Sequence, residues 1–265
     1  DLKNNIMKDP KGKILGYDAV NNDNDPMDDH YHGTAVAGII AATGNNGSGV
    51  AGICQSAQII PVKVLNKNGA GSVLSVVRGV EFAVSAGAKI LNNSYTTVID
   101  INKTEVGIHP TIAAAYNNAS KKGVLAVVSA GNDKKNINKV HKSYAAPVNS
   151  IYVAALDSSN NAFASFSNYG PNIVSLAAPG TNMVSTYPKN RYVAGLNGTS
   201  FSAPMVTATL ALIWNASGKT YSATGGHLAL RNKFLASLPK DPYLANISTS
   251  GRYLGMLPLK QAFFK

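Results

Sequence analysis

A Gly-Thr-Ser triplet at residues 198–200 leads into a run of apolar and small residues. The run, Met205 to Trp214, is long enough for a buried helix, which places Ser200 at or just before the helix N-terminus. Free backbone N–H groups and the positive end of the helix dipole favour an oxyanion there. Pro204 is expected in the first turn, where its missing N–H has no intrahelical partner. Ser200 is therefore either an ordinary helix cap or a nucleophile.

Two other stretches contain residues that could work with such a serine. His32 begins a small-residue helical stretch at residues 32–39, and a neutral imidazole can take a serine proton near physiological pH. Asn132 follows the buried strand predicted at Val124–Ala130, and its amide could donate a hydrogen bond to an oxyanion. Taken singly, a helix-terminal histidine and a turn asparagine are common structural residues. The other histidines have no such context and are expected at the surface or in loops: His30, His109, His141 and His227.

In combination, three motifs in this order resemble the subtilisin-like serine peptidases (subtilases): His-Gly-Thr, Ala-Gly-Asn and Gly-Thr-Ser-Phe-Ser-Ala-Pro. The resemblance runs over nearly the whole chain, to Gly251-Arg252. It implies a serine endopeptidase in which Ser200 is the nucleophile and His32 the general base. Asn132 and the Ser200 backbone N–H would bind the oxyanion, and no catalytic metal is needed. The resemblance also implies substrate-binding residues for an extended peptide: Ser94, Tyr95, Thr96 and Gly131.

Strand-like and helix-like stretches alternate along the chain, which predicts a single α/β domain over residues 1–265. We expect three layers, with a mainly parallel central sheet flanked by helices. Ligands bind at the carboxyl ends of such strands, where Ser94 and Asn132 lie. The predicted strands are Ile59–Leu65, Lys89–Tyr95, Val124–Ala130, Ile151–Ala155 and Ile173–Ala177, with a short one at Ile14–Tyr17. The predicted helices are His32–Thr43, Ser72–Ala86, Ile112–Lys122 and His227–Leu235, before a packing segment at Leu254–Phe264.

The carboxylate that would orient His32 is not found in the sequence. Subtilases place this Asp at the end of the first core strand, in an Asp-Thr-Gly or Asp-Ser-Gly motif that this chain lacks. Asp1 has no preceding strand to hold it, and the acidic residues between Asp18 and Asp29 belong to the loop before His32. We therefore expect that the first core strand is missing and that the chain is truncated at its N-terminus.

Two interpretations of the missing carboxylate remain open. The chain is either part of an ordinary peptidase, which the intact His32, Asn132 and Ser200 favour, or a pseudo-enzyme that binds peptides or acts as a scaffold. Loss of the carboxylate alone should lower turnover by ~10⁴. Ala35 and Met205 replace histidines that are common in the family, and Tyr95-Thr96-Thr97 replaces a Leu-Gly-Gly stretch beside the specificity pocket. The preferred P1 side chain therefore stays open.

The composition fits a globular protein, with 45% hydrophobic and 14% charged residues. The net charge of +11 could indicate binding of an anion such as nucleic acid, but the lysines are dispersed and no nucleic-acid motif occurs. Cys54 is the only cysteine and is expected to be buried. No apolar run is long enough to span a membrane. The resemblance implies a secreted or extracytoplasmic monomer that acts on protein or peptide substrates and is made with a propeptide.

A glycine-rich loop at residues 44–52 corresponds to a loop with which many subtilases bind calcium. The oxygens expected there are the Asn45 and Asn46 side chains and backbone carbonyls, with no carboxylate. Structural calcium at this loop would be weakly bound, and a plain turn is the favoured interpretation.

Overall fold

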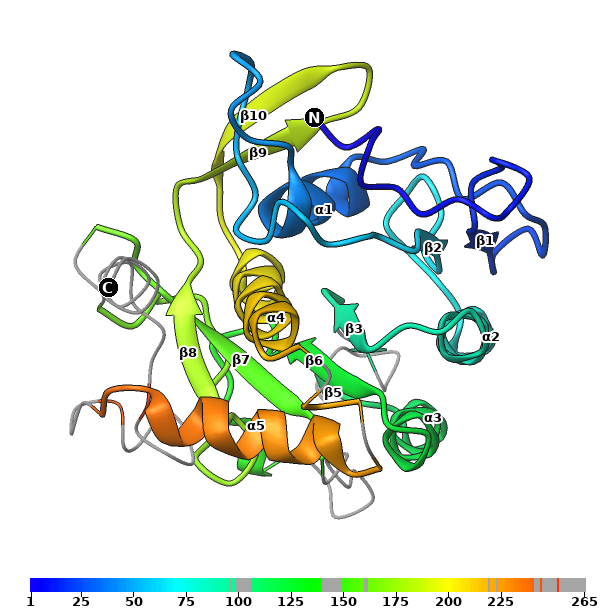
Figure 1. Ribbon diagram of the computed structural model, residues 1–265. Helices are drawn as coiled ribbons and strands as arrows, with labels where there is room; N and C mark the ends of the chain where they lie inside the picture. Colours follow the sequence, from blue (N-terminus) through cyan, green and yellow to red (C-terminus); the bar gives the residue numbers. More distant parts are fainter. Residues whose placement is uncertain are drawn as a thin grey trace.

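The computed structural model describes residues 1–95, 97–98, 106–139, 149–159, 162–218, 220–222, 224–240, 244 and 252. Helices and strands alternate within these residues, as the sequence predicts (Figure 1). The helices are α1 (His32–Ala41), α2 (Val73–Ser85), α3 (Pro110–Lys121), α4 (Thr199–Ala216) and α5 (Gly226–Ser237), with a short 3-10 helix at Ile137–Lys139. The first strands are β1 (Tyr17–Asp18), β2 (Val62–Lys63), β3 (Ile90–Asn93), β4 (Thr97–Val98) and β5 (Val106–Gly107). The later strands are β6 (Leu125–Ser129), β7 (Ile151–Leu156), β8 (Leu176–Pro179), β9 (Met183–Tyr187) and β10 (Arg191–Leu196).

Four parallel strands form the central sheet in the order β3-β6-β7-β8. Leu91 lies opposite Ala126, and Val127 lies opposite Ile151. Every residue of β6 and β7 is buried, as expected for parallel strands covered on both faces. The predicted parallel sheet is confirmed.

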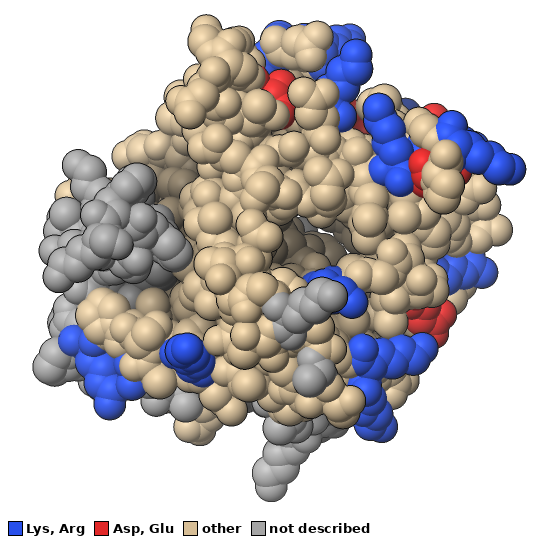
Figure 2. Space-filling model, viewed as in Figure 1, with Lys and Arg blue, Asp and Glu red and all other residues tan. Residues whose placement is uncertain are grey.

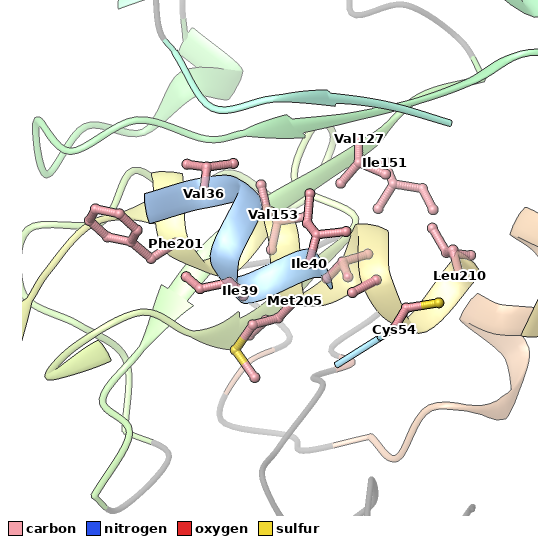
Figure 3. Close-up of a cluster of buried hydrophobic side chains, with 14 of the residues drawn as sticks. Val36, Ile39, Ile40, Cys54, Val127, Ile151, Val153, Phe201, Met205 and Leu210 are labelled. Carbon is pink, nitrogen blue, oxygen red and sulfur yellow. The ribbon is translucent and has the colours of Figure 1, made fainter. Parts of the chain in front are cut away.

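Alternate residues of the central strands serve two different cores. Val127 and Val153 pack with α1 and α4 on one face (Figure 3). Val128 and Tyr152 point the other way and pack with α2 and α3. The sheet is therefore the middle layer, with helices packed on both of its faces, and the predicted three-layer α/β fold is confirmed.

Residues 181–196, for which no element was predicted, form an antiparallel hairpin from β9 and β10. Tyr187 pairs with Arg191, so the turn is residues 188–190, and Lys189 and Asn190 have left-handed φ of 64° and 54°. Asn190 was the available signal, since asparagine tolerates this conformation. The hairpin projects from the sheet, and α1 packs against its strand β9 (Figure 1).

Several predicted boundaries change in the structure. The strand predicted at Ile59–Leu65 is reduced to β2, which begins after Pro61 because proline cannot donate to a sheet ladder. The strand predicted at Ile14–Tyr17 begins only at Tyr17, and the one predicted at Ile173–Ala177 begins only at Leu176. The packing segment predicted at Leu254–Phe264 lies outside the described residues.

Positive side chains are dispersed over the surface. Figure 2 shows the lysines and arginines of one face in several separate groups rather than in a continuous patch. Among the described helices, none is long and apolar enough to cross a membrane.

Gly38 allows α1 to pack closely against β9. A Cβ at this position would collide with the side chains of Ser185 and Thr186 and would lie 2.9 Å from the Thr186 backbone N. We expect Gly38→Ala to lower the free energy of unfolding by about 1–3 kcal/mol, because the helix must move away from the hairpin. Urea denaturation followed by circular dichroism measures the change.

Gly33→Ala is the matched control on the same helix. Its Cβ would lie 3.6 Å from the nearest atom, Asp28 Oδ2, which is ordinary contact. We expect this variant to be as stable as the parent or more stable, because alanine favours the helix. Equal stability losses in both variants would contradict the packing explanation.

Candidate functional site

Ser200 is the second residue of α4, as predicted from the Gly-Thr-Ser triplet. The Gly198 carbonyl accepts from the Phe201 N–H at 3.0 Å, and the Gly198 N–H donates to the Gly180 carbonyl at 2.8 Å. These bonds hold the turn that leads into the helix. Every residue from 199 to 210 is buried except Ser200, which is half-buried. The first three turns of α4 are thus packed into the core, and only Ser200 is accessible there.

The position of Pro204 corrects one prediction. Pro204 is the sixth residue of α4 and lies beyond the first turn. An α-helical N–H at this position would donate to the Ser200 carbonyl, and proline has none. The Ser200 carbonyl instead accepts from the Ser94 hydroxyl at 2.8 Å. The helix therefore continues through Pro204 with an outside donor for its unpaired carbonyl.

His32 is the first residue of α1, and its imidazole lies against the first turn of α4. Its ring centroid is 5.6 Å from that of Phe201, the neighbour of Ser200. Asp28 caps α1 from the preceding loop, because its Oδ2 accepts from the Thr34 N–H at 2.8 Å and from the Thr34 hydroxyl at 2.6 Å. The two helix N-termini thus bring the predicted base and nucleophile into one region.

The Ser200 hydroxyl donates to the Ser94 carbonyl at 3.3 Å. Within the described part of the chain, no hydrogen bond joins the His32 ring to Ser200 or to a carboxylate. In this resting arrangement, the proposed nucleophile and base are neighbours without a direct proton path.

Burial lowers the pKa of His32, because the charged imidazolium loses solvation. The neighbouring His30 lowers the pKa further, and the Asp28 carboxylate partly opposes both effects. A position at the positive end of α1 also disfavours the imidazolium. The neutral ring that can accept a proton is therefore the favoured form.

Asn132 is held by Thr199 in a defined orientation. Its Oδ1 accepts from the Thr199 N–H at 2.9 Å and from the Thr199 hydroxyl at 3.0 Å. The Thr199 hydroxyl oxygen accepts in turn from the Gly131 N–H at 3.0 Å. With the oxygen used in this way, the Nδ2 donor remains for a ligand beside Ser200. This role of Thr199 was not predicted, although its position next to Ser200 in the triplet was the available signal.

The predicted substrate-binding residues differ in their surroundings. Gly131 and Ser94 are buried beside α4, and the two Ser94–Ser200 bonds bring Ser94 directly to the candidate nucleophile. The Tyr95 side chain points into the core, where its hydroxyl lies 2.7 Å from that of Tyr116 and donates to Asn93 Oδ1 at 2.9 Å. Only the Tyr95 backbone is therefore available to a peptide, and Thr96 lies outside the described residues.

The acidic residues near the N-terminus are occupied elsewhere. The Asp1 carboxylate accepts from Asn46 Nδ2 at 2.8 Å and from the Val50 N–H at 3.1 Å, which fixes it to the 44–52 loop. Asp18 and Asp29 both lie 3.3 Å from Lys63 Nζ. The prediction that the 44–52 loop has no carboxylate is therefore wrong, because Asp1 folds back onto it.

One of the other four histidines does not lie at the surface or in a loop as predicted. His227 is only 4% exposed, and its Nε2 lies 3.0 Å from the Ser120 hydroxyl, so the prediction of a surface residue is wrong. His227 is buried because it lies on the inner face of α5, beside Leu230 and Phe234. His30 is exposed, His109 caps α3, and His141 lies outside the described residues.

Comparison with known proteins gives a consistent assignment. The model of the subtilase family matches residues 1–241. The chain belongs to the subtilase family. The thermophilic serine proteinase of Bacillus sp. (strain AK1) is 40% identical over 206 residues, which cover 77% of this chain and 48% of that protein. Thermitase of Thermoactinomyces vulgaris is 36% identical over 206 residues, which cover 77% of this chain and 69% of thermitase.

The subtilase fold is also found by structural comparison. The crystal structure of a cold adapted subtilisin-like serine proteinase matches with a TM-score of 0.75 and 24% identity, over 92% of this chain and 82% of that one. This subtilase chain spans about half the length of two of its relatives, the Bacillus proteinase at 48% and the thermostable alkaline protease of Halalkalibacterium halodurans at 47%.

The pKa of His32 offers a direct test of the site's electrostatics. We expect the imidazole to titrate below the ordinary pKa of 6.5, so that the neutral form predominates at pH 6.5. His30→Gln should raise this pKa, because a neighbouring positive charge is removed. Asp28→Asn should lower it, because the opposing negative charge is lost, while the asparagine oxygen can still cap α1. Titration of the ring protons by NMR measures all three values.

His109→Gln is the control, because His109 caps α3 and not α1. We expect no change in the titration of His32. Shifts of the same sign in the His30 and Asp28 variants would contradict the charge assignment.

Proposed function

We propose that this subtilase chain hydrolyses peptide bonds as a serine endopeptidase. The observation that carries the proposal is the orientation of Asn132, whose oxygen is bonded twice to Thr199 so that its amide donor remains available beside Ser200. A serine that only caps a helix would not need the Asn132 amide donor beside it. The names of the relatives, a serine proteinase and thermitase among them, support the same chemistry.

The proposed reaction begins with attack of Ser200 Oγ on the substrate carbonyl carbon. His32 takes the hydroxyl proton as general base and later gives it to the leaving amine. The negative charge that develops on the substrate oxygen is stabilised by Asn132 Nδ2, the Ser200 N–H and the positive end of α4. Water then attacks the acyl-enzyme with His32 again as base, which releases the carboxylic acid product.

The substrate is proposed to be an extended protein or peptide segment that binds beside residues 94–95 and Gly131. The Ser94 carbonyl now accepts from Ser200 Oγ at 3.3 Å, a long bond that a substrate N–H could replace. Such replacement would free the Ser200 hydroxyl to turn toward His32. Substrate binding would then also activate the nucleophile.

A carboxylate that orients His32 is proposed to enter between β2 and β3. Backbone bonds from Tyr17 to Pro61 and from Ala19 to Lys63 use one edge of β2, so the N–H and C=O of Val62 face the opposite side. In the described sheet β3 pairs only with β6 and is an edge strand. Figure 2 shows a hollow near the centre of this face, where Figure 1 separates β3 from α1 and β2. Two open parallel edges beside a hollow suit an added strand.

The alternative function is a peptide-binding or scaffold domain without catalysis. The observation that favours it is the resting state of Ser200, which is bonded to the Ser94 carbonyl while no described carboxylate is hydrogen-bonded to His32. Both functions use the same peptide site, so peptide binding alone cannot separate them. Covalent reactivity of Ser200 can separate the peptidase from the scaffold function.

Location and assembly are proposed from the family alone. We propose that the protein is secreted or extracytoplasmic, acts as a monomer and is made with a propeptide that occupies the peptide site. Sedimentation velocity and mass spectrometry of the native secreted protein would test these proposals, and a dimer or an intracellular location would contradict them.

Labelling with a fluorophosphonate tests the proposed chemistry. We expect slow labelling of Ser200, which is faster with an added apolar strand peptide that ends in Asp, because its carboxylate orients His32. A peptide that ends in Asn is the matched control and should have no effect. Ser200→Ala should abolish labelling, and mass spectrometry identifies the modified residue.

Asn132→Ala should slow this labelling and peptide turnover with little change in stability, because Asn132 is exposed. In subtilisin, a member of the same family, loss of an oxyanion donor lowers turnover by ~10²–10³. Unlabelled but folded protein with either peptide would favour the scaffold function. Undiminished labelling of Asn132→Ala would remove Asn132 from the mechanism.

We further propose that the 44–52 loop binds calcium weakly. Asp1 supplies one carboxylate. The Asn46 oxygen accepts from the Ser48 N–H at 3.1 Å, so Asn46 would add a ligand only by giving up that bond. The described residues contain no group of three or more His, Cys, Asp or Glu that could hold a metal, which is why the affinity should be low.

Calcium should raise the melting temperature at millimolar concentrations. A tenfold excess over Kd corresponds to about 1.4 kcal/mol of stabilisation. Asp1→Asn should remove most of the shift, and magnesium should have little effect because it demands a tighter geometry. Equal shifts with the parent and Asp1→Asn would contradict the site.

A further inference from the structure

Pro204 leaves the carbonyl of the candidate nucleophile without its helical partner. The donor that replaces the missing N–H is the Ser94 hydroxyl, at 2.8 Å from the Ser200 carbonyl oxygen. Ser94 is only 7% exposed and Pro204 is buried, so water has little access to this carbonyl. A buried carbonyl without a donor costs about 1–3 kcal/mol. The position of Ser94 therefore bears directly on the turn that carries Ser200.

The Ser94 hydroxyl is itself held by Asn92. Asn92 Nδ2 donates to Ser94 Oγ at 2.9 Å, and Asn92 Oδ1 accepts from the Thr207 hydroxyl at 2.8 Å. Thr207 lies seven residues after Ser200 on α4, about two helical turns away on the same face. The chain of bonds thus leaves α4 at Thr207, passes through the end of β3 and returns to α4 at Ser200.

Each donor in this chain has one acceptor, which fixes the direction of the bonds. The Thr207 proton goes to Asn92, an Asn92 amide proton goes to Ser94, and the Ser94 proton goes to the Ser200 carbonyl. If the Asn92 amide were reversed, Ser94 would have to donate to Asn92. The Ser200 carbonyl would then lose its donor.

The opposite face of β3 is held by a separate set of bonds. Asn93 Nδ2 donates to the Val127 carbonyl at 3.2 Å, and its Oδ1 accepts from the Tyr95 hydroxyl. Because side chains alternate along a strand, Asn92 and Asn93 fix the end of β3 from both faces. Ser94 is thus mounted on a rigid strand end.

We propose that Asn92 and Thr207 are positioning residues for Ser200. They orient the Ser94 hydroxyl, which replaces the helical hydrogen bond removed by Pro204 and so fixes the first turn of α4. Ser200 Oγ and the Ser200 N–H are both carried by that turn. The inference rests on the proposed function for its chemical consequence, but the arrangement of the bonds can be tested without activity.

A purely structural role for the Thr207–Asn92 pair is the competing explanation. Any buried hydroxyl that loses its partner destabilises a protein by a similar amount. A stability measurement therefore cannot separate the two explanations. Measurements on the Ser200 carbonyl and on the reactivity of the Ser200 hydroxyl can separate them. The hydrogen-bond chain Thr207–Asn92–Ser94–Ser200, called the relay below, ends at that residue.

NMR observes the Ser200 carbonyl through the Phe201 amide in protein labelled with carbonyl-¹³C serine and ¹⁵N-phenylalanine. The chain has two Ser–Phe pairs, 200–201 and 165–166, and the second is an internal reference. We expect Ser94→Ala, Asn92→Leu and Thr207→Val each to move the Ser200 carbonyl signal upfield and to leave that of Ser165 unchanged.

Thr209→Val is the matched control. Thr209 is buried on the same helix, but its hydroxyl donates within α4 to the Met205 carbonyl at 2.8 Å. We expect this variant to lose similar stability and to leave the Ser200 signal unmoved. Equal movement of the Ser200 signal in the Thr207 and Thr209 variants, or no movement in either, would overturn the relay.

Labelling of Ser200 by the fluorophosphonate measures the chemical consequence. Thr207→Val should react roughly threefold to tenfold more slowly, the range expected for one lost hydrogen bond, and Thr209→Val at the parent rate. In a Pro204→Ala background, the new N–H can donate to the Ser200 carbonyl, so Ser94→Ala and Thr207→Val should have much smaller effects. Unchanged effects in that background would overturn the positioning role.

The two proposals fail in different ways. If the parent protein is folded but never labelled, the proposed peptidase function fails, while the carbonyl signal still tests the relay. If the parent is labelled but the Ser200 carbonyl does not respond to Thr207→Val, the relay fails and the peptidase function stands.

Discussion

The packing of α1 against α4 is the contact on which the candidate site depends. His32 and Ser200 lie at the N-termini of these two helices, so their relative position follows from the helix contact and not from a flexible loop. Val36 and Ile39 of α1 meet Phe201 and Met205 of α4 in one buried cluster (Figure 3). Removal of apolar surface from water fixes the helices far more firmly than any single polar bond in the site. The hydrophobic core therefore sets the distance between His32 and Ser200, the proposed base and nucleophile, and hydrogen bonds refine their orientation.

Those refining bonds satisfy backbone groups that the fold would otherwise leave unpaired. The Thr199 N–H lies in the first turn of α4, where it has no helical acceptor, and Asn132 accepts from it. The Ser200 carbonyl loses its helical donor to Pro204, and Ser94 donates to it. Two unpaired backbone groups at the helix start thus become the attachment points of Asn132, the proposed oxyanion donor, and of Ser94, a proposed substrate-binding residue.

Much of this arrangement was predictable from the sequence, because the signals were local. β6, β7 and α4 could be located as continuous apolar runs and α2 by its helical periodicity, and the three motifs singled out His32, Asn132 and Ser200. Long-range pairs were not predictable: nothing in the sequence links Thr207 to Asn92, which are 115 residues apart. The hairpin of β9 and β10 was missed because its turn is Pro-Lys-Asn and not Asn-Gly. The burial of His227 was missed because a lone histidine does not reveal which face of α5 turns inward.

The lowered pKa of His32 and the proposed entry of a carboxylate are linked by one electrostatic argument. A buried imidazole at a positive helix end stays neutral, which makes it available as a base but weak as a proton acceptor. A carboxylate in the hollow between β2 and β3 would stabilise the imidazolium and raise the pKa of His32 toward the range in which proton transfer from Ser200 is efficient. Within the described residues, the free edges of β2 and β3 and the lack of a carboxylate hydrogen-bonded to His32 would then both be accounted for by one proposed strand position. Filling that position would add sheet hydrogen bonds and basicity together, so stability and reactivity should rise in parallel.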